Sequence, residues 1–542
     1  MFTALSLSER IADTLERYGK NILLRDTNVT WTGSEVACKI SQIQKYIEVS
    51  TLPGSLVGVC FPNWAVQGLT ILAVIHSKRI PVILSYSDLS EQTEYWIEKT
   101  RVSLLLSLDE LTPRTGPLVQ SIGIDVEGNI IDDESLRNFP LSPQTQTSRA
   151  PKGTALVLYT SGSTGEPKGI CVPERGIIVT SDYLIDYFKL DERTVTPIVL
   201  PVCHSMALNT QFIPTFLAGG CSTFINARLG MNKLFRHIEK EEGTFISLIG
   251  EVLRVCWEEK KRKKLNPNLR VQHVQLAGGM ILEQHVRMAR EIFPNALIHK
   301  GYGLTEAIRV TMIDHRDPAF VQSIVGTTLP FQEIEIRTTD GFSADLDDMG
   351  EVFVKGPNVM LGILGRPITH LDSRGFMATG DLGSLNVQGQ LAIFGRKDSI
   401  FKVNGLKVSG LAIEKVAYKV GPYVREAKCL AVTDQRRAGN KVVLFLEILF
   451  DSQPDFFKNY FETFNRSLWN ELKTLNHFPR DIILMAKFPR TSNGKLSIKG
   501  LQKIWEEDNK QMINLSDEAN ILYYKVEESA SDFSQKLIGD VL

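Results

Sequence analysis

The chain has 542 residues, with 61 Lys and Arg against 62 Asp and Glu, so its formal net charge is −1. A protein built to hold nucleic acid usually carries a basic excess that neutralises phosphates, and this balance excludes a strongly basic binder of that class. The length predicts three or four folding units of roughly 100 to 200 residues each. With 43% hydrophobic and 23% charged residues, the composition is that of a globular protein.

Redox and targeting signals predict a protein of the cytoplasm. The seven cysteines are scattered and never form a Cys-x-x-Cys pair, which favours reduced thiols and gives no support for a structural zinc site. Glu9, Arg10 and Asp13 interrupt the apolar stretch that a signal peptide requires, and the segment predicts an amphipathic helix capped by Ser6 or Ser8. Residues 55–84 are the most apolar, yet polar residues break them, so no membrane span of ~20 residues is expected.

Strand-like apolar runs alternate with amphipathic helical segments through about the first 325 residues. The strand-like runs cover residues 155–159, 195–200 and 244–249, and the helical segments cover residues 177–188 and 282–292. This alternation predicts an α/β fold with largely parallel sheets.

The pattern changes after about residue 325. Short β-type runs at residues 333–338, 350–355 and 390–394 are separated by Gly, Pro and Asp, which predicts a small antiparallel sheet or barrel. Residues 395 to about 505 combine strand-like runs with a helix-length segment near residues 456–475, which predicts a compact α+β domain. Residues 506–542 have helical texture and many charges, and no role is assigned to them.

A glycine-rich segment, Tyr159–Gly169, follows the first of the strand-like runs. Its glycines let the backbone approach a polyanion closely, and its hydroxyls and Lys168 add donors and positive charge. The spacing is not that of a P-loop kinase or GTPase, because Lys168 is followed by glycine instead of Ser or Thr. A flexible Gly/Ser turn is the alternative interpretation. The candidate phosphate-binding residues are Thr160, Ser161, Gly162, Ser163, Thr164, Gly165 and Lys168.

Further short motifs follow in order along the chain. They are GYGLTE at residues 301–306, TGD at 379–381, GRKD at 395–398, KVNGLKV at 402–408 and PRTSNGK at 489–495. Alone, each would be an ordinary turn or surface loop. Together with the glycine-rich segment, they closely resemble the ordered motifs of the adenylate-forming superfamily, which includes acyl- and aryl-CoA synthetases, peptide synthetase adenylation domains and firefly luciferase. The resemblance runs from the opening helix to about residue 505.

The resemblance implies a particular α/β architecture. A large N-terminal AMP-binding domain, residues 1–394, would contain two α/β subdomains plus a small β-barrel-like subdomain. A small mobile α+β domain, residues 395–505, would carry the catalytic lysine. Residues 506–542 would form a C-terminal tail, which we expect to be helical.

The resemblance also implies a nucleotide site. In relatives, the residue at Tyr302 lies against adenine, the one at Thr305 meets a phosphate, and the one at Glu306 supplies a hard oxygen ligand to Mg²⁺. Asp381 would accept hydrogen bonds from both ribose hydroxyls, and Arg396 would also reach the ribose. The other nucleotide-binding residues implied are Gly278, Gly279 and Gly303.

Lys495 is the residue to which the resemblance gives the largest catalytic part. Its ammonium would bridge the attacking carboxylate and the α-phosphate and offset the charge that builds up there. Asp398 occupies the hinge position at which relatives swing the C-terminal domain. Lys402 belongs to the segment that lines the thiol channel. The catalytic set implied is Lys495, Thr305, Glu306, His204 and Lys402.

The segment Leu200–Thr210 bears on the substrate. It contains no acidic residue where amino-acid-activating relatives hold the α-ammonium, which disfavours an amino acid because that charge would be unpaired. It resembles instead the P-x-x-H segment of acyl- and aryl-CoA ligases, with His204 beside the substrate carboxylate; a packing histidine is the alternative. Small or apolar pocket residues suit a neutral aromatic or alkyl acid. The pocket positions implied are His204, Gly250, Ala277, Gly278 and Met280.

The implied reaction joins a small carboxylic acid to ATP, releases pyrophosphate, and then transfers the acyl group to a thiol. The expected cofactors are ATP, Mg²⁺ and CoA, or the phosphopantetheine of an acyl carrier protein as an alternative partner. A stand-alone adenylation enzyme that loads a carrier protein or an amine remains an alternative, as does a non-catalytic binding protein on the same fold. The oligomeric state stays open, and neither nucleic acid nor a membrane span is expected.

Overall fold

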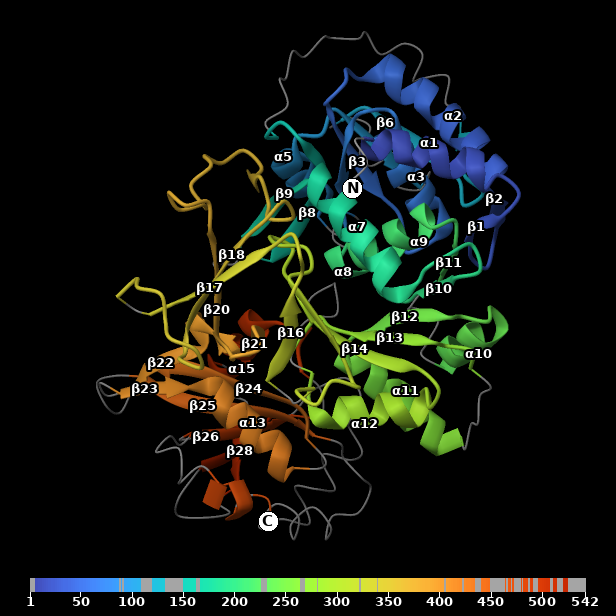
Figure 1. Cartoon of the computed structure of the whole chain (residues 1–542). Coiled ribbons are helices and arrows are strands. Elements are labelled where there is room, and N and C mark those ends of the chain that lie inside the picture. Colours follow the sequence, from blue (N-terminus) through green and yellow to red (C-terminus); the bar gives the residue numbers. More distant parts are fainter. Residues whose placement is uncertain are drawn as a thin grey trace. The chain divides into compact units, whose positions relative to one another are not determined.

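The computed structural model describes residues 5–86, 89, 92–108, 119–131, 150–161, 166–225, 232–263, 269–279, 281–320, 323–338, 340–403, 406–421, 424–433, 440–448, 464, 466–468, 470–471, 479, 481–485, 488–490, 496–506, 510–513 and 520–524. The chain divides into two compact units, residues 1–379 with 383–393, and residues 380–382 with 394–542. The chain passes from one unit to the other within β20 (Met377–Leu385) and within β21 (Gln390–Arg396) (Figure 1).

An eight-stranded sheet in the first unit has the order β19-β9-β8-β4-β3-β5-β6-β7. Its inner strands run parallel, β3 with β4 and β5, β4 with β8, and β5 with β6, as the helix–strand alternation predicted. Their apolar side chains are buried along the whole strand because helices cover both faces of such a sheet. The strands are β3 (Leu56–Cys60), β4 (Ile80–Ile83), β5 (Leu104–Ser107), β6 (Ser121–Ile124), β7 (Ile130–Ile131), β8 (Thr154–Ser161), β9 (Pro167–Pro173) and β19 (Gly362–Ile363).

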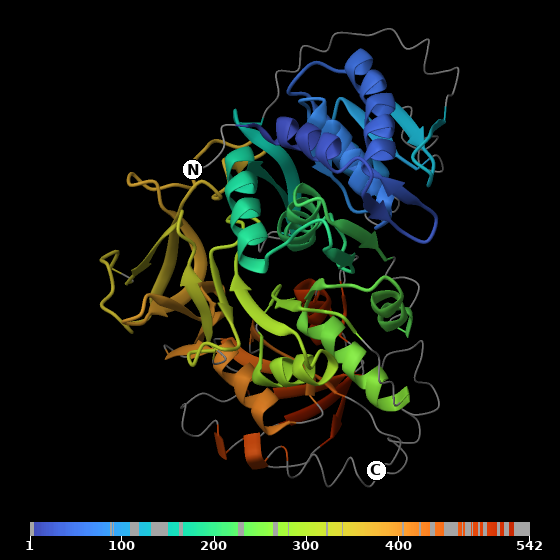
Figure 2. The ribbon, with the colours of Figure 1, turned by 45° about the vertical axis from the view of Figure 1, so that its right-hand side comes forward.

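A four-stranded sheet, order β10-β11-β1-β2, and a set of helices complete this part of the unit. The opening helix begins as predicted, since Ser6 accepts from the Glu9 backbone N–H in a capping box. Helices α1, α2 and α3 pack against one another (Figures 1 and 2). The elements are β1 (Ile22–Arg25), β2 (Thr30–Thr32), β10 (Val195–Ile198), β11 (Cys221–Phe224), α1 (Leu7–Arg17), α2 (Gly33–Ser50), α3 (Ala65–His76), α5 (Thr93–Thr100), α7 (Glu174–Phe188), α8 (Ser205–Ala207), the π-helix η3 (Leu208–Phe212) and α9 (Ile213–Leu217).

A nine-stranded sheet, order β12-β13-β14-β15-β16-β21-β20-β18-β17, changes character along its width. Strands β12, β13 and β14 are parallel, whereas β15 and β16 are antiparallel to their neighbours, as are β17 and β18 to each other. The antiparallel strands predicted after residue 325 are therefore present, and they continue the same sheet. The elements are β12 (Phe245–Leu248), β13 (His273–Leu276), β14 (Leu297–Tyr302), β15 (Thr311–Asp314), β16 (Ile324–Thr328), β17 (Glu333–Arg337), β18 (Gly350–Lys355), α10 (Asn232–Lys240), α11 (Gly250–Lys263) and α12 (Glu283–Ile292).

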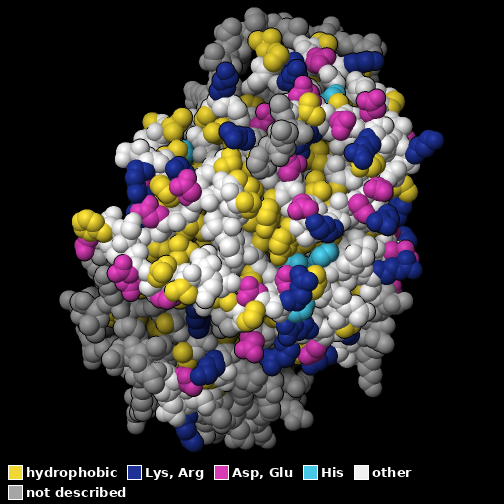
Figure 3. Space-filling model, viewed as in Figure 1, with side chains coloured by type: hydrophobic (Ala, Val, Ile, Leu, Met, Phe, Trp, Pro, Cys, Tyr) yellow, Lys and Arg dark blue, Asp and Glu magenta, His cyan; other side chains and the backbone are white. Residues whose placement is uncertain are grey.

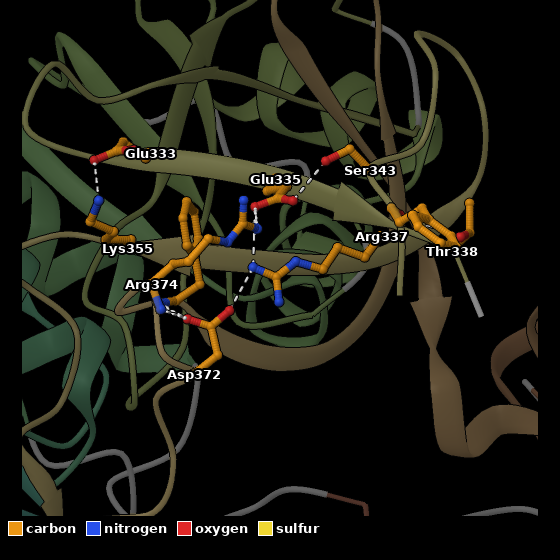
Figure 4. A network of polar contacts seen from close by, with 10 residues as sticks. Glu333, Glu335, Arg337, Thr338, Ser343, Lys355, Asp372 and Arg374 are labelled. Atoms are coloured by element: carbon orange, nitrogen blue, oxygen red, sulfur yellow. Dashed lines mark hydrogen bonds and ion pairs between the residues drawn. The ribbon is translucent and has the colours of Figure 1, made fainter. Parts of the chain in front are cut away.

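A closed ion network lies on β17 and the loop before β20 (Figure 4). The Arg337 guanidinium lies 3.1 Å from Glu335 and 2.7 Å from Asp372, and it covers the Phe353 ring at 3.9 Å from the ring centre. Arg374 also pairs with Glu335. Hydrogen bonds from Arg374 and then Arg337 lower the pKa of Glu335 to about 2, so each charge in the network is compensated.

The second unit is an α+β assembly, as predicted for the C-terminal region. A five-stranded sheet, order β24-β25-β26-β28-β27, is accompanied by a hairpin of β22 and β23. Most of the helix-length segment predicted near residues 456–475 lies outside the described residues. The elements are the 3-10 helix η5 (Lys397–Ser399), β22 (Ile400–Val403), β23 (Leu406–Ser409), α13 (Gly410–Val420), β24 (Val424–Thr433), β25 (Asn440–Ile448), β26 (Asp481–Met485), α15 (Ile498–Glu506), β27 (Lys510–Ile513) and β28 (Asn520–Tyr524).

The C-terminal tail corrects one expectation, because its described residues form strands instead of the predicted helix. Strand β28 runs parallel to β26 and antiparallel to β27. The run Ile521–Tyr524 is rich in residues that favour β-structure, and the adjacent edge of β26 supplies backbone partners that a single sequence does not reveal. These residues therefore belong to the sheet of the second unit.

Two surface observations complete the fold. Among the described residues, no helix combines the length and the apolar character that a membrane crossing requires. On the face shown in Figure 3, acidic and basic side chains of the described surface are interspersed rather than segregated by sign.

Candidate active site

The carboxyl ends of the parallel strands β12, β13 and β14 bring together several of the predicted site residues. The register pairs Leu248 with Leu276, and Leu276 with Lys300. Gly250, Ala277 and Tyr302 therefore follow at the same edge of the sheet. Ligands of open α/β sheets bind at this edge, so the arrangement suits a pocket built from three distant segments.

The turn after β13 has the backbone freedom that close approach to a ligand requires. Gly278 has φ +86°, and a Cβ added there would lie 2.7 Å from Cγ2 of Ile249. At Gly279 a Cβ would meet nothing within 4 Å. Ala277 is buried and its N–H donates to Leu248 O over 3.4 Å, whereas Met280 lies outside the described residues.

Gly250 has a packing reason for its identity besides its place at this edge. A Cβ at this position would lie 2.7 Å from Cε1 of His285, on α12. Burial lowers the pKa of His285 to about 4, so the ring is neutral near neutral pH. The proximity of Gly250 to a substrate thus stays a prediction.

The segment after β14 forms a tight, backbone-bonded turn. Tyr302 pairs with Thr311 of β15, and the Val310 N–H donates to Tyr302 O over 2.7 Å. A Cβ on Gly303 would lie 2.7 Å from the Arg309 backbone nitrogen, so only glycine fits there. Thr305 and Glu306, both half-buried, occupy this turn.

Asn358 fixes this turn from a neighbouring segment. It is fully buried, and its amide donates to the backbone oxygens of Ile308 and Arg309, the latter over 2.9 Å. The Met360 N–H donates to the backbone oxygen of Glu306 over 2.8 Å. Because the main chain is anchored, the Glu306 carboxylate is presented from a defined position. The sequence analysis missed Asn358, and a lone asparagine carries little signal.

Glu306 suits a Mg²⁺ ion held mainly by a nucleotide. Among the described residues, no group of three or more His, Cys, Asp or Glu could hold a metal ion. Mg²⁺ keeps several waters and commonly binds one or two carboxylates together with substrate phosphates. The donor chemistry therefore fits magnesium that arrives with a phosphate ligand, and does not fit an all-protein cage.

The glycine-rich segment joins two antiparallel strands. Thr160 at the end of β8 pairs with Lys168 of β9, and Ser161 pairs with Pro167. The two candidate residues Thr160 and Lys168 thus face each other across the base of the loop. Glu166 at the loop's end lies 3.1 Å from Lys99 Nζ. The candidates Gly162, Ser163, Thr164 and Gly165 lie outside the described residues.

His204 begins the helical segment that follows β10. It is the N-cap of α8, and its backbone N–H donates to Pro201 O over 3.0 Å. Met206 Sδ lies 3.9 Å from the Cβ position of Gly278, which places α8 against the turn after β13. The next turns form a π-helix, a feature found frequently at functional sites.

Three buried polar residues beside this edge were not singled out from the sequence: Arg309, Thr210 and Gln275, here called the Arg309 cluster. Arg309 Nη2 donates to Thr210 Oγ1 over 3.5 Å, and Gln275 Nε2 donates to the same oxygen over 3.1 Å. The sequence offered one indication of this cluster, because Arg309 lies within the apolar run after Glu306. An arginine is almost never fully buried unless it is paired.

The ribose-binding pair predicted from the sequence lies together in the second unit. Arg396 Nη1 is 3.2 Å from Asp381 Oδ1; the Asp381 side chain is 7% exposed and that of Arg396 is 46% exposed. Gly380 has φ +73°, and a Cβ there would lie 3.0 Å from Arg396 Nη2. The motif glycine therefore makes room for the guanidinium.

The remaining predicted residues of the second unit are placed only in part. Asp398 lies in η5 and Lys402 in β22, but their side chains are outside the described residues, as is all of Lys495. The segment of Lys495 is flanked by a bridge between Arg490 and Leu496. Arg490 in turn pairs with Glu426 at 2.6 Å and with Glu447 at 3.2 Å. The base of this loop is therefore anchored to the five-stranded sheet.

Comparison with known proteins gives a family match and several relatives. The family model described as AMP-binding enzyme matches residues 11–364. The chain is 23% identical to oxalate–CoA ligase of Arabidopsis thaliana over 71% of this chain and 77% of that protein. It is 24% identical to D-alanine–D-alanyl carrier protein ligase of Bacillus licheniformis over 87% of this chain and 93% of that protein. It also matches a plipastatin synthase protein of Bacillus subtilis at 27% identity over 76% of this chain, but spans 16% of that protein.

A solved structure shares the fold. The o-succinylbenzoate CoA synthetase MenE from Bacillus subtilis, in complex with ATP and magnesium ion, matches with a TM-score of 0.72 and 20% identity. The match covers 90% of this chain and 98% of that chain. The predicted α/β fold class, with a large N-terminal and a small C-terminal part, is thereby confirmed.

Proposed function

The chain belongs to the family of AMP-binding enzymes, and on that premise we propose that it activates a carboxylic acid as an acyl-adenylate and passes the acyl group to the thiol of CoA. The observation that carries this proposal is the Thr305–Glu306 turn, anchored by Asn358 at the carboxyl edge of β12, β13 and β14. The named CoA ligase among the relatives supports the acceptor.

The proposed reaction has two steps. In the first, a carboxylate oxygen attacks the α-phosphorus of ATP, an oxygen–phosphorus bond forms, and pyrophosphate leaves. In the second, a thiol loses its proton and attacks the acyl carbon, and AMP leaves with the electron pair. A bare carboxylate is a poor electrophile because its leaving group would be oxide, and adenylation removes this obstacle.

The chain's own residues would act by positioning and by neutralising charge. Thr160 and Lys168, which face each other at the base of the glycine-rich loop, would bind phosphate oxygens. Asp381 would accept from the ribose hydroxyls, with Arg396 beside it. Lys495 would offset the charge that develops between the carboxylate and the α-phosphate. When bound, Mg²⁺ would withdraw charge from the phosphates, with Glu306 as a ligand.

Residues 395–505 are proposed to move as the mobile domain, with residues 1–394 as the AMP-binding domain. The chain leaves the first compact unit after Ile393 and enters the second at Phe394. Because hinges lie at such boundaries, this supports a hinge at the nearby Asp398. A cytoplasmic location is part of the proposal, supported by the scattered spacing of the seven cysteines along the sequence.

Acid-dependent exchange of labelled pyrophosphate into ATP tests the first step. A broad panel of carboxylic acids should contain at least one that supports exchange. If no acid does, the proposal fails and a non-catalytic binding protein on this fold becomes the better description.

The acceptor has a second candidate, because the carrier protein ligase relative matches over most of both chains. Product formation should be compared with CoA alone and with a phosphopantetheinyl carrier protein. A CoA thioester supports the leading proposal, whereas product with the carrier alone, or with an amine, would replace the acceptor and leave the first step intact.

Lys495→Ala should reduce adenylate formation by a factor of about 100 to 1000, while thioester formation from supplied acyl-adenylate largely survives. Lys499→Ala is a matched control, since Lys499 is an exposed lysine four residues further along, in α15. Equal loss of both steps in Lys495→Ala would contradict the assignment of this lysine to the first step.

A further inference from the structure

Arg309 is a buried cation that lacks an anionic partner in the described part of the chain. The residue is 4% exposed. Its guanidinium donates to Thr210 Oγ1 over 3.5 Å, and its Nε has no hydrogen-bond partner among the residues that the structure describes. Buried charges in proteins are normally paired, because an uncompensated charge in a low dielectric is costly. Something outside the described chain is therefore expected to compensate this charge.

The neighbouring groups do not supply that compensation. Burial lowers the pKa of Arg309 to about 10. The phenols of Tyr183 and Tyr187 act in the opposite direction and raise it. Burial raises the pKa of both tyrosines, so both phenols stay neutral. Near neutral pH the site therefore contains one positive charge and two neutral rings.

The backbone holds Arg309 in an unfavourable conformation. Its φ is +44°, in the left-handed region that residues with a side chain rarely adopt. The Asn358 amide holds the Arg309 carbonyl over 2.9 Å and so fixes this conformation. Strained backbone of this kind persists where the surroundings impose it, and it is concentrated at functional sites.

Space for the guanidinium comes from a glycine. A Cβ on Gly301 would lie 2.0 Å from Arg309 Nη1, so no other residue fits under the guanidinium without moving it. Gly301 is in β14, directly before Tyr302. The positive charge thus lies against the strand that leads into the predicted nucleotide site.

The Arg309 cluster adjoins the predicted acid pocket. The Thr210 hydroxyl donates to Met206 O over 2.7 Å, and the Met206 sulfur lies 3.9 Å from the Cβ position of Gly278. The side-chain oxygen of Gln275, two residues before Ala277, has no hydrogen-bond partner within the described ranges of the chain. One turn of chain therefore connects the unpaired guanidinium to residues expected to line the pocket.

We propose that the acid activated by this protein carries a second anionic group, a carboxylate, which pairs with the Arg309 guanidinium. This inference rests on the proposed function and names its substrate class, a dicarboxylic acid, in place of the neutral acid expected from the pocket's residue types. A carboxylate matches the fork of guanidinium N–H donors, and the pair satisfies the buried charge. A neutral terminal group would leave that charge unpaired.

The first test uses the wild-type protein and matched pairs of acids in pyrophosphate exchange. Each pair compares a diacid with its neutral half-amide: succinate with succinamate, glutarate with glutaramate, and terephthalate with 4-carbamoylbenzoate. The inference expects at least one diacid to exceed its half-amide by about 100-fold or more in kcat/KM. If monoacids and half-amides support exchange and diacids do not, the proposed function stands and this inference is wrong.

The second test removes the charge. Arg309→Gln should lose about 100-fold or more in kcat/KM for the diacid and much less for the half-amide, so the ratio between the two acids should fall. Arg316→Gln is the control. Arg316 lies seven residues after Arg309, is exposed, and pairs with Asp314. Equal loss for both members of a pair in Arg309→Gln would show a purely structural role and overturn the inference.

A binding measurement separates this inference from the adenylation proposal. Without ATP, the favoured diacid should raise the Tm of the wild-type protein and of Arg316→Gln, and should leave the Tm of Arg309→Gln unchanged. Should no acid support exchange, the same experiment still decides the inference. Stabilisation by a diacid that depends on Arg309 supports it, and the absence of stabilisation by every diacid overturns it.

Discussion

Two arginines in the first unit show opposite ways of placing a positive charge. Arg337 lies between the carboxylates of Glu335 and Asp372 and above an aromatic ring, so its charge is compensated within the fold. Arg309 is more deeply buried and has one hydroxyl as its described hydrogen-bond partner. The two arginines therefore differ in what surrounds the charge: carboxylates of the described chain surround that of Arg337, and a hydroxyl contacts that of Arg309.

The difference separates a structural cation from a ligand-binding one. In the network of Arg337 the positive charge is paired with two carboxylates, so its substitution should change stability alone. An open site such as that of Arg309 costs stability in the free protein and regains it when an anion binds. Substitutions in the two regions should therefore affect different measured quantities.

The largest effect is expected from Asn358→Ala, which breaks the Arg309 side of the comparison without touching Arg337. The change leaves the backbone oxygens of Ile308 and Arg309 without their buried donor. We expect the free energy of unfolding to fall by about 3 kcal/mol, and adenylation to fall with it. Chemical denaturation and pyrophosphate exchange measure the two effects.

Asn386→Ala is the control for that variant, because the half-buried Asn386 side chain also bonds to the backbone, as an acceptor from the Gln388 and Gln390 N–H groups in a hairpin turn. It should cost less than about 1 kcal/mol and leave adenylation unchanged. Equal effects of the two variants on exchange would show that Asn358 does not position the site.

Gly301→Ala should come next, because the new Cβ would displace the Arg309 guanidinium. Overpacking of this kind costs about 2 kcal/mol of unfolding free energy. The loss should be relieved in part by Arg309→Gln, whose shorter side chain vacates the contact. A double-mutant cycle measures this coupling, and strictly additive effects would argue against the contact.

Arg337→Met should have a smaller effect, limited to stability. The variant keeps the contact with the Phe353 ring but loses both carboxylate pairs, which we expect to cost about 1 to 2 kcal/mol. Pyrophosphate exchange with every acid in the panel should match the wild type. A change in the preference between diacid and half-amide would contradict the distinction between the two arginines.

The smallest effect concerns acid stability. The folded-state pKa of Glu335 is about 2, below the ordinary glutamate value of about 4.3, so the unfolded chain binds more protons between these values. This contribution to stability is complete above about pH 5 and is lost as the pH falls towards 2. Urea unfolding at a series of pH values should show a shallower acid decline in Arg337→Met than in the wild type. The slope in Arg309→Gln should equal that of the wild type.

Local patterns accounted for much of the fold. The apolar runs predicted as strands at residues 155–159 and 244–249 correspond to β8 and β12, and the segment at residues 282–292 corresponds to α12 within one residue. Such elements can be predicted because the periodicity of burial is written into neighbouring residues. Residues 510–513 and 520–524 could not, since their strands depend on a partner, β26, outside the tail.

The candidate site divides in the same way. The roles of Thr305, Glu306, Asp381 and Arg396 were predicted from the sequence through the resemblance of short motifs to those of a known family, and they stay predictions. The structure added Asn358 and the Arg309 cluster. These residues come from segments more than thirty positions apart, and nothing local to any one of them predicts the contact.

By itself, the sequence determined the balanced charge, the α/β class and the order of the family motifs, because each is set by composition or by residues adjacent in the chain. The tertiary structure alone decided which cations are compensated. Arg309 and Arg337 are the same residue type in the same unit. Among the described residues a carboxylate lies beside Arg337 and none lies beside Arg309, and this depends on which segments the fold brings together. That difference, invisible in a net charge of −1, is what points to a dicarboxylic acid.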